Sequence, residues 1–172
     1  MRRWVVLCSA ALPLVAVGIL ATGVSPSTAA VVYLAAVTPW ITWYDLREHR
    51  IPNALVVPAI GLGLASCAGE WLASGRPPIE PLVAGAGCTA FLLLLNLMGG
   101  MGMGDVKLGA ALGLASWSPS VAVLSPVIAF FVGGIVSAVL LTLGRRGARI
   151  AFGPFLLGGF WVAVGLVAVS RL

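Results

Sequence analysis

The chain contains only two aspartates, Asp45 and Asp105, and each lies at one end of a strongly apolar run. A carboxylate near the end of a membrane span costs about 1–3 kcal/mol to insert, so such residues are more often functional than accidental. Two carboxylates a few ångströms apart do not both ionise readily, and one of them holds a proton near working pH. Such a pair can activate water as a general base and supply a proton as a general acid. The sequence therefore predicts a paired aspartate site suited to amide hydrolysis.

The residues around Asp105 suit a substrate-binding site. Gly102 and Gly104 carry no side chain, so an extended substrate backbone could approach Asp105 closely. A flexible turn between helices would also be rich in glycine, and the adjoining aspartate favours the first interpretation. Lys107 lies two positions beyond Asp105 and so would not share its helix face. Its first interpretation is contact with lipid headgroups, and its second is contact with the substrate or the aspartates.

A short polar segment follows Asp45. Pro52 is expected to end one helix, and Asn53 to begin and cap the next, so both are interpreted as residues that shape the site. His49 is the only histidine of the chain. It has no visible partner in the sequence, and a pair of aspartates leaves it no necessary role. We therefore predict that His49 is a solvated loop residue.

The composition indicates a membrane protein. Of the 172 residues 60% are hydrophobic and 9% are charged, and the mean hydropathy is +1.11. A soluble domain carries about 25% charged residues, so this chain is predicted to cross the bilayer several times. Its 22 glycines suit closely packed transmembrane helices. Cys8, Cys67 and Cys88 are scattered without a C-x-x-C pair, which predicts buried thiols and neither a metal site, a cofactor nor a disulfide framework.

Seven apolar runs predict an all-α bundle of about six to seven transmembrane helices. The runs cover residues 4–24, 29–45, 54–73, 81–98, 106–118, 121–143 and 153–170. The fifth is too short to cross at full thickness and is predicted to be a short or partly buried span, packed through Gly109 and Gly113. We expect one domain over residues 1–172, in which residues 1–28 form an uncleaved anchor span; a secretory signal is the alternative.

The basic residues predict the topology. The net charge of +5 lies in short clusters between apolar runs, which is typical of topology signals and argues against a nucleic-acid partner. With the N-terminus in the cytoplasm, eight of the ten basic residues are cytoplasmic, namely Arg2, Arg3, Arg47, Arg50, Lys107, Arg145, Arg146 and Arg149. Arg76 and Arg171 then face outward. Asp45 and Asp105 fall at the same cytoplasmic boundary, although sixty positions separate them.

Three segments together resemble the type IV prepilin leader peptidases. Residues 102–108, Gly-Met-Gly-Asp-Val-Lys-Leu, are similar to the G-x-G-D motif of that family. Asp45 followed by Ile51-Pro52-Asn53 resembles its first aspartate motif, and Phe152-Gly153-Pro154-Phe155 resembles its F-G-P-F-L segment. The three occur in the family's order. G-x-G-D alone also occurs in presenilin-type proteases, whereas the three segments together are specific.

This resemblance implies a membrane aspartic endopeptidase with Asp45 and Asp105 as its catalytic pair. Such enzymes act at the cytoplasmic face of the inner (plasma) membrane and need no cofactor. They remove a short, positively charged leader from prepilins and pseudopilins, ahead of the hydrophobic N-terminal helix. Longer members carry an N-terminal domain with paired cysteines that is linked to N-methylation. This chain has no such cysteines, so it resembles the short form and methyltransferase activity is not predicted.

A second hypothesis is a small proton- or ion-coupled transporter that uses the two aspartates as relay groups. It predicts carboxylates near the bilayer midplane and polar residues along several spans. The runs here are poor in such residues, and both aspartates lie at one edge. A structural scaffold, the third hypothesis, leaves the placement of the aspartates unexplained. The peptidase hypothesis therefore ranks first.

Overall fold

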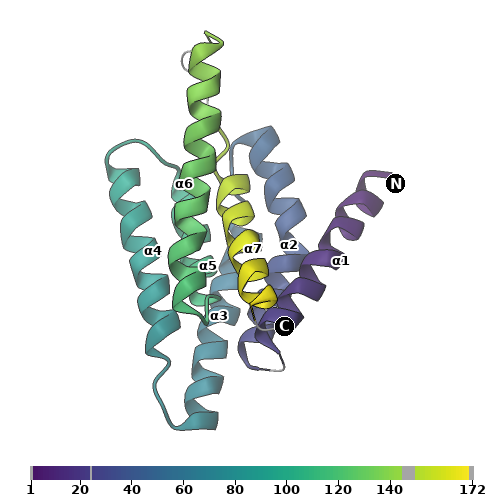
Figure 1. Ribbon diagram of the computed structural model, residues 1–172, viewed down its shortest axis with the longest axis vertical. Coiled ribbons are helices and arrows are strands. Elements are labelled where there is room, and N and C mark those ends of the chain that lie inside the picture. Colours follow the sequence, from purple (N-terminus) through teal and green to yellow (C-terminus); the bar gives the residue numbers. More distant parts are fainter. Residues whose placement is uncertain (1, 24, 145–149, 171–172) are drawn as a thin grey trace.

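The structure, a computed structural model, describes residues 2–23, 25–144 and 150–170. Every regular element in these ranges is an α-helix, and the seven helices form one bundle (Figure 1). They are α1 (Arg2–Thr22), α2 (Ser27–Glu48), α3 (Asn53–Ser74), α4 (Ile79–Leu97), α5 (Met103–Leu114), α6 (Pro119–Thr142) and α7 (Gly153–Val169). The predicted all-α membrane bundle is confirmed, and six of the seven predicted runs lie within a few residues of a helix.

The fifth helix differs from its predicted run, residues 106–118, by beginning three residues earlier and ending four residues earlier. The predicted run was bounded by hydropathy, which marks only apolar residues, whereas a helix begins at the residue where its first turn can form. Gly102 takes the N-cap position, and Asp105 lies in the first turn, where a carboxylate interacts favourably with the helix dipole. Ala115–Ser118 is apolar enough to extend the run but forms the connection to α6.

Helix α5 is the short buried element that the sequence predicted. Most of its residues from Val106 onward are buried, and it packs against α3, α4 and α7. A Cβ added to Gly113 would lie 2.7 Å from the Gly85 Cα of α4, and one added to Gly109 would meet the Leu92 side chain of α4. The predicted packing of α5 through its two glycines is thus confirmed.

Replacing Gly113 by alanine is expected to destabilise the fold. The new methyl group would meet the Ala84 carbonyl oxygen at 2.7 Å, and backbone cannot move aside as a flexible side chain can. Overpacking of this kind costs about 1–3 kcal/mol. The free energy of unfolding, measured by denaturant titration in mixed micelles, should fall by that amount. Gly61→Ala on α3 is the matched control, because a Cβ there meets nothing within 4 Å; equal stability of the two variants would contradict the prediction.

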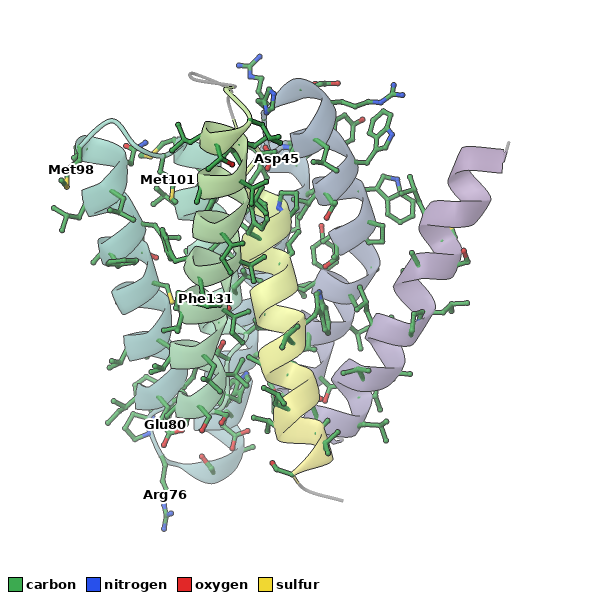
Figure 2. The ribbon with its side chains drawn as sticks, turned by 45° about the horizontal axis from the view of Figure 1, so that its top comes forward. Asp45, Arg76, Glu80, Met98, Met101 and Phe131 are labelled. Carbon is green, nitrogen blue, oxygen red and sulfur yellow. The ribbon has the colours of Figure 1, made fainter. Side chains whose placement is uncertain are left out.

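Within the described ranges three helices, α3, α4 and α6, are long and apolar enough to cross a membrane, while α1 and α7 contain shorter apolar stretches. Successive helices run in opposite directions, so the α2–α3 and α4–α5 connections lie at one end of the bundle with the start of α7 (Figure 1). Asp45 lies at this end, and Arg76 and Glu80 lie at the other (Figure 2). We call the first of these the aspartate end. Arg145, Arg146, Arg149 and Arg171 lie outside the described residues, and the predicted cytoplasmic orientation stays a prediction.

Candidate active site

Asp45 lies in the last turn of α2, and its side chain is only 5% exposed. Its Oδ2 accepts a hydrogen bond of 2.8 Å from the backbone N–H of Gly153, the first residue of α7. The first backbone N–H groups of a helix have no partner within the helix, and its N-terminus carries partial positive charge. The start of α7 therefore holds the Asp45 carboxylate and favours its ionised form.

A second hydrogen bond also joins α7 to α2. The Trp161 indole Nε1 donates a hydrogen bond of 2.9 Å to the Thr38 Oγ1, and both residues are buried. Thr38 lies about two turns before Asp45 on α2, and Trp161 lies about two turns after Gly153 on α7. Two buried hydrogen bonds along this antiparallel pair set the register that brings Gly153 to Asp45.

Asp105 lies in the first turn of α5, three residues after Gly102, and is half-buried. The backbone amide of Gly102 hydrogen-bonds the carboxylate. Its Oδ1 is buried and has no hydrogen-bond partner among the described residues. Buried polar atoms in proteins are usually satisfied, so an unpartnered one at a candidate site is a place for a water or a reacting group. Asp105 thus has an oxygen available for chemistry.

The side chain of Ile51 connects the two aspartate sites. A Cβ on Gly104, next to Asp105, would lie 3.0 Å from the Ile51 Cβ. A Cβ on Gly153 would lie 3.2 Å from the Ile51 Cδ1 and 2.7 Å from the Asp45 Oδ2. One isoleucine therefore packs against both the start of α5 and the start of α7. The charge of Asp45 also acts on Asp105, which places the two carboxylates within electrostatic range.

The two carboxyl groups differ in their protonation. Both lie at helix ends, outside the three candidate spans. Burial raises the pKa of Asp105 to about 6; the charge of Asp45 also raises it, and the Gly102 amide lowers it. Burial raises the pKa of Asp45 as well, while the Gly153 N–H and the charge of His49 lower it. Asp105 is therefore the member of the pair that keeps its proton to the higher pH.

His49 is exposed, as the sequence predicted, but it also ends α2. Its backbone is left-handed, with φ 49°, and its N–H donates to the Asp45 carbonyl oxygen at 2.9 Å. Among the described residues it is the only non-glycine residue with positive φ. This position at a helix C-terminus usually favours glycine or asparagine. The local sequence gave no indication that His49 would end the helix beside the carboxylate.

Lys107 and Asn53 meet at the edge of the site. The Lys107 Nζ donates a hydrogen bond of 3.0 Å to the Asn53 Oδ1, which joins α5 to α3. The prediction that Asn53 caps α3 is wrong: Pro52, in extended conformation, takes the N-cap position, and no side chain caps the helix. Because Asn53 is the first helical residue, its side chain is free to accept from Lys107. Lys107 itself reaches Asn53 instead of extending only toward headgroups.

The Gly153 backbone amide was missed by sequence reasoning, which used residues 152–155 only as part of the family resemblance. A usable signal was present, because proline is favoured in the first turn of a helix and Pro154 directly follows Gly153. This marks residue 153 as a helix start whose free amide can bind an anion. No group of three or more His, Cys, Asp or Glu side chains that could hold a metal ion occurs in the described ranges.

Comparison with known proteins gives one consistent family. The sequence model of the type IV leader peptidase family matches residues 30–143, which include Asp45 and Asp105. No solved structure gave a significant match. The chain is 34% identical over 125 residues to the prepilin leader peptidase/N-methyltransferase of Xanthomonas campestris pv. campestris, covering 69% of this chain and 43% of that protein.

Proteins of the same name from two other genera are similarly related. The Aeromonas hydrophila protein is 33% identical over 145 residues, covering 80% of this chain and 49% of the relative. The Neisseria gonorrhoeae protein is 32% identical over 133 residues, covering 71% of this chain and 43% of the relative. The chain spans about half the length of the curated relatives it matches. The family match covers more than half of the chain and contains both aspartates, and the chain therefore belongs to the type IV leader peptidase family.

Proposed function

We propose that this chain is an aspartic endopeptidase that removes the leader from type IV prepilin- or pseudopilin-like precursors, with Asp45 and Asp105 as its catalytic pair. The observation that carries the proposal is the asymmetry of the two carboxyl groups. Asp45 accepts from the helix-start amide of Gly153, whereas the Oδ1 of Asp105 has no partner among the described residues. A base and an acid held side by side are what water-dependent amide cleavage requires.

In the proposed mechanism the ionised Asp45 takes a proton from a water, and the water oxygen bonds to the scissile carbonyl carbon. Asp105 gives its proton to the carbonyl oxygen, which yields a neutral gem-diol. The proton on Asp45 then passes to the leaving nitrogen, and Asp105 takes a proton back from one hydroxyl. The C–N bond breaks, a carboxylic acid and an amine are released, and both aspartates return to their starting states.

The two glycines before Asp105 have different proposed roles. Gly104 packs against Ile51, so its missing side chain serves close packing inside the site. Gly102 is exposed, and a Cβ there would meet only the Asp105 Oδ2, at 3.4 Å. An extended substrate backbone would therefore approach at Gly102. Pro52, Asn53 and Lys107 shape the adjoining edge, where Lys107 would contact either substrate or lipid headgroups.

We further propose that the aspartate end faces the cytoplasm and that the protein is a multi-pass protein of the inner (plasma) membrane. Arg47 and Arg50 flank the end of α2 near Asp45 and are exposed, and Lys107 lies at the same end. Arg76 lies at the opposite end (Figure 2). This distribution supports the positive-inside orientation. Residues 1–172 would act as one domain, with α1 as its anchor.

Leader removal tests the proposed function. The full chain, reconstituted in nanodiscs, would be incubated with a tagged prepilin-like precursor from the same genome. Mass spectrometry would then identify the new N-terminus. We expect one cut directly before the hydrophobic helix. No cleavage of any prepilin-like precursor of that genome would overturn the proposal, and proton flux in liposomes would then test the transporter hypothesis.

The pH dependence of cleavage should show the protonated state of Asp105. The pKa of Asp105 is raised to about 6, so its proton is present below that value and lost above it. The apparent kcat/KM, which reports the free enzyme, should therefore fall as pH rises through about 6. At lower pH kcat/KM should fall again, as Asp45 becomes protonated. The apparent pKa values read from the two limbs are properties of the coupled pair. A profile without the alkaline limb would contradict the assignment of Asp105 as the acid.

A further inference from the structure

A large apolar groove lies between α4 and α6. Its volume is about 1020 Å³, and its walls are formed by residues 79–91 of α4 and 119–131 of α6. Several wall residues are strongly exposed, among them Val83, Val123 and Phe131. Glu80, at the end away from the aspartates, is the only charged residue in the lining (Figure 2). The groove follows α4 for about 18 Å, which is more than half the thickness of a bilayer core.

The groove marks a seam between two pairs of helices. Helix α4 packs extensively on α5 and helix α6 on α7, whereas α4 and α6 contact each other little. A small void of about 20 Å³ lies at this seam, bounded by all four helices, including Gly109 of α5 and Leu156 of α7. The first pair carries Asp105 at the start of α5, and the second carries Gly153 at the start of α7. The seam thus divides the elements that hold the two halves of the site.

Aromatic rings connect the groove to the active site. Phe91 and Phe130 line the groove, and their ring centroids lie 5.5 Å apart. Phe130 lies 4.8 Å from Phe152, the residue directly before Gly153. A contact in the groove at Phe91 or Phe130 is therefore linked, through the ring of Phe152, to Gly153, whose N–H binds Asp45. This chain of ring contacts links the groove to the start of α7.

We propose that the hydrophobic helix of the precursor docks in this groove, with the scissile bond at the aspartates. This inference rests on the proposed function. In that substrate the cleaved bond precedes the helix, so the N-terminal end of the helix would lie at the aspartate end and its remainder would run toward Glu80. Ala84, Gly87 and Ala122 are small residues in the lining, and a Cβ on Gly87 meets nothing within 4 Å. Small residues let a helix approach closely, as transmembrane helix pairs require.

Filling the groove should separate helix docking from chemistry. In Gly87→Leu a side chain enters the groove with no clash at its Cβ. Gly134→Leu on α6 is the matched control, because a Cβ there also meets nothing within 4 Å and Gly134 lies outside the lining. For the full precursor, Gly87→Leu is expected to raise KM or lower kcat so that kcat/KM falls about tenfold or more, because binding at the remote helix is lost. For a short soluble peptide that spans the cleavage site but lacks the helix, kcat/KM should stay unchanged.

The outcomes distinguish the proposed peptidase function from the proposed docking of the precursor helix in the groove. If the wild type cleaves neither substrate, the proposed function fails. If the wild type cleaves the precursor and Gly87→Leu cleaves it equally well, the groove assignment is overturned. A direct test needs no turnover: a photo-cross-linker at Val127, inside the groove, should capture the precursor, whereas one at Val139, exposed on the same helix outside the lining, should not. Capture at Val127 of a second copy of this chain, or of lipid alone, would overturn the assignment.

Discussion

Asparagine in place of either aspartate is expected to abolish leader cleavage. In the proposed mechanism, Asp45→Asn removes the group that takes a proton from water, and Asp105→Asn removes the group that protonates the carbonyl oxygen. Each proton-transfer role contributes about 10²–10⁴-fold to the rate, and groups that act as a unit do not contribute additively. We therefore expect each single variant, and the double variant, to lose about the same large factor. Cleavage of a tagged precursor, followed over time at equal enzyme concentration, measures it.

Two carboxylates at the other end of the bundle provide the control. Glu80 lies in the first turn of α4, far from Asp45 along the bundle (Figure 2). Glu70 lies near the end of α3, shortly before Arg76, which is at that same end of the bundle. Glu70→Gln and Glu80→Gln remove a negative charge just as the aspartate variants do. They should cleave a short peptide at the wild-type rate. Substantial cleavage by Asp45→Asn or Asp105→Asn in correctly inserted protein would instead show that the catalytic pair is not these two residues.

The same variants can show which of the two aspartates holds the proton, without any measurement of cleavage. Because the chain contains only two aspartates, protein labelled with ¹³C at the aspartate side-chain carboxyl gives two signals, and each Asn variant leaves one. The Asp105 signal should titrate near pH 6 in the wild type and at lower pH in Asp45→Asn, since the charge of Asp45 raises the pKa of Asp105. An Asp105 titration that Asp45→Asn leaves unchanged would show that the two groups do not interact.

The helices could be predicted from sequence because hydropathy is a local property. Each run of about twenty apolar residues becomes a helix regardless of its neighbours, and alternating direction then places the α2 and α5 ends that carry the aspartates together. Gly102, Gly104 and Asp105 lie in one short segment, so their proximity follows directly from the sequence. What sequence alone left open was which helices are neighbours and how far each is shifted along the other.

The contacts that complete the site depend on which helices are neighbours and on their register. Gly153 lies 108 positions from Asp45, and their hydrogen bond depends on the register of α7 against α2. Ile51 is an unremarkable apolar residue in sequence, yet it packs between the starts of α5 and α7. The Lys107–Asn53 hydrogen bond depends on how α5 lies beside α3. Each is a relation between distant segments that composition, periodicity and local motifs do not determine.

Alanine at position 153 is expected to impair catalysis nearly as much as loss of an aspartate, although it leaves both carboxyl groups in place. The added Cβ would lie 2.7 Å from the Asp45 Oδ2 and 3.3 Å from its Cγ, so the carboxylate has to move away from the Gly153 N–H. A displacement of about 1 Å at a reacting group can cost about 10²-fold in rate. The loss should appear in kcat for the short peptide, with KM little changed.

The pH profile distinguishes this positioning role from a general loss of structure. The Gly153 N–H lowers the pKa of Asp45, so the variant that disrupts this hydrogen bond should raise it. The acidic limb of kcat/KM should then move to higher pH. Gly158→Ala on the same helix is the matched control, because a Cβ there meets nothing within 4 Å. If Gly153→Ala keeps the wild-type rate and pH profile, the start of α7 does not position Asp45; if both alanine variants lose activity equally, α7 matters only for folding. Loss confined to Gly153→Ala, with the shifted limb, would mean that the helix start sets which aspartate acts as the base.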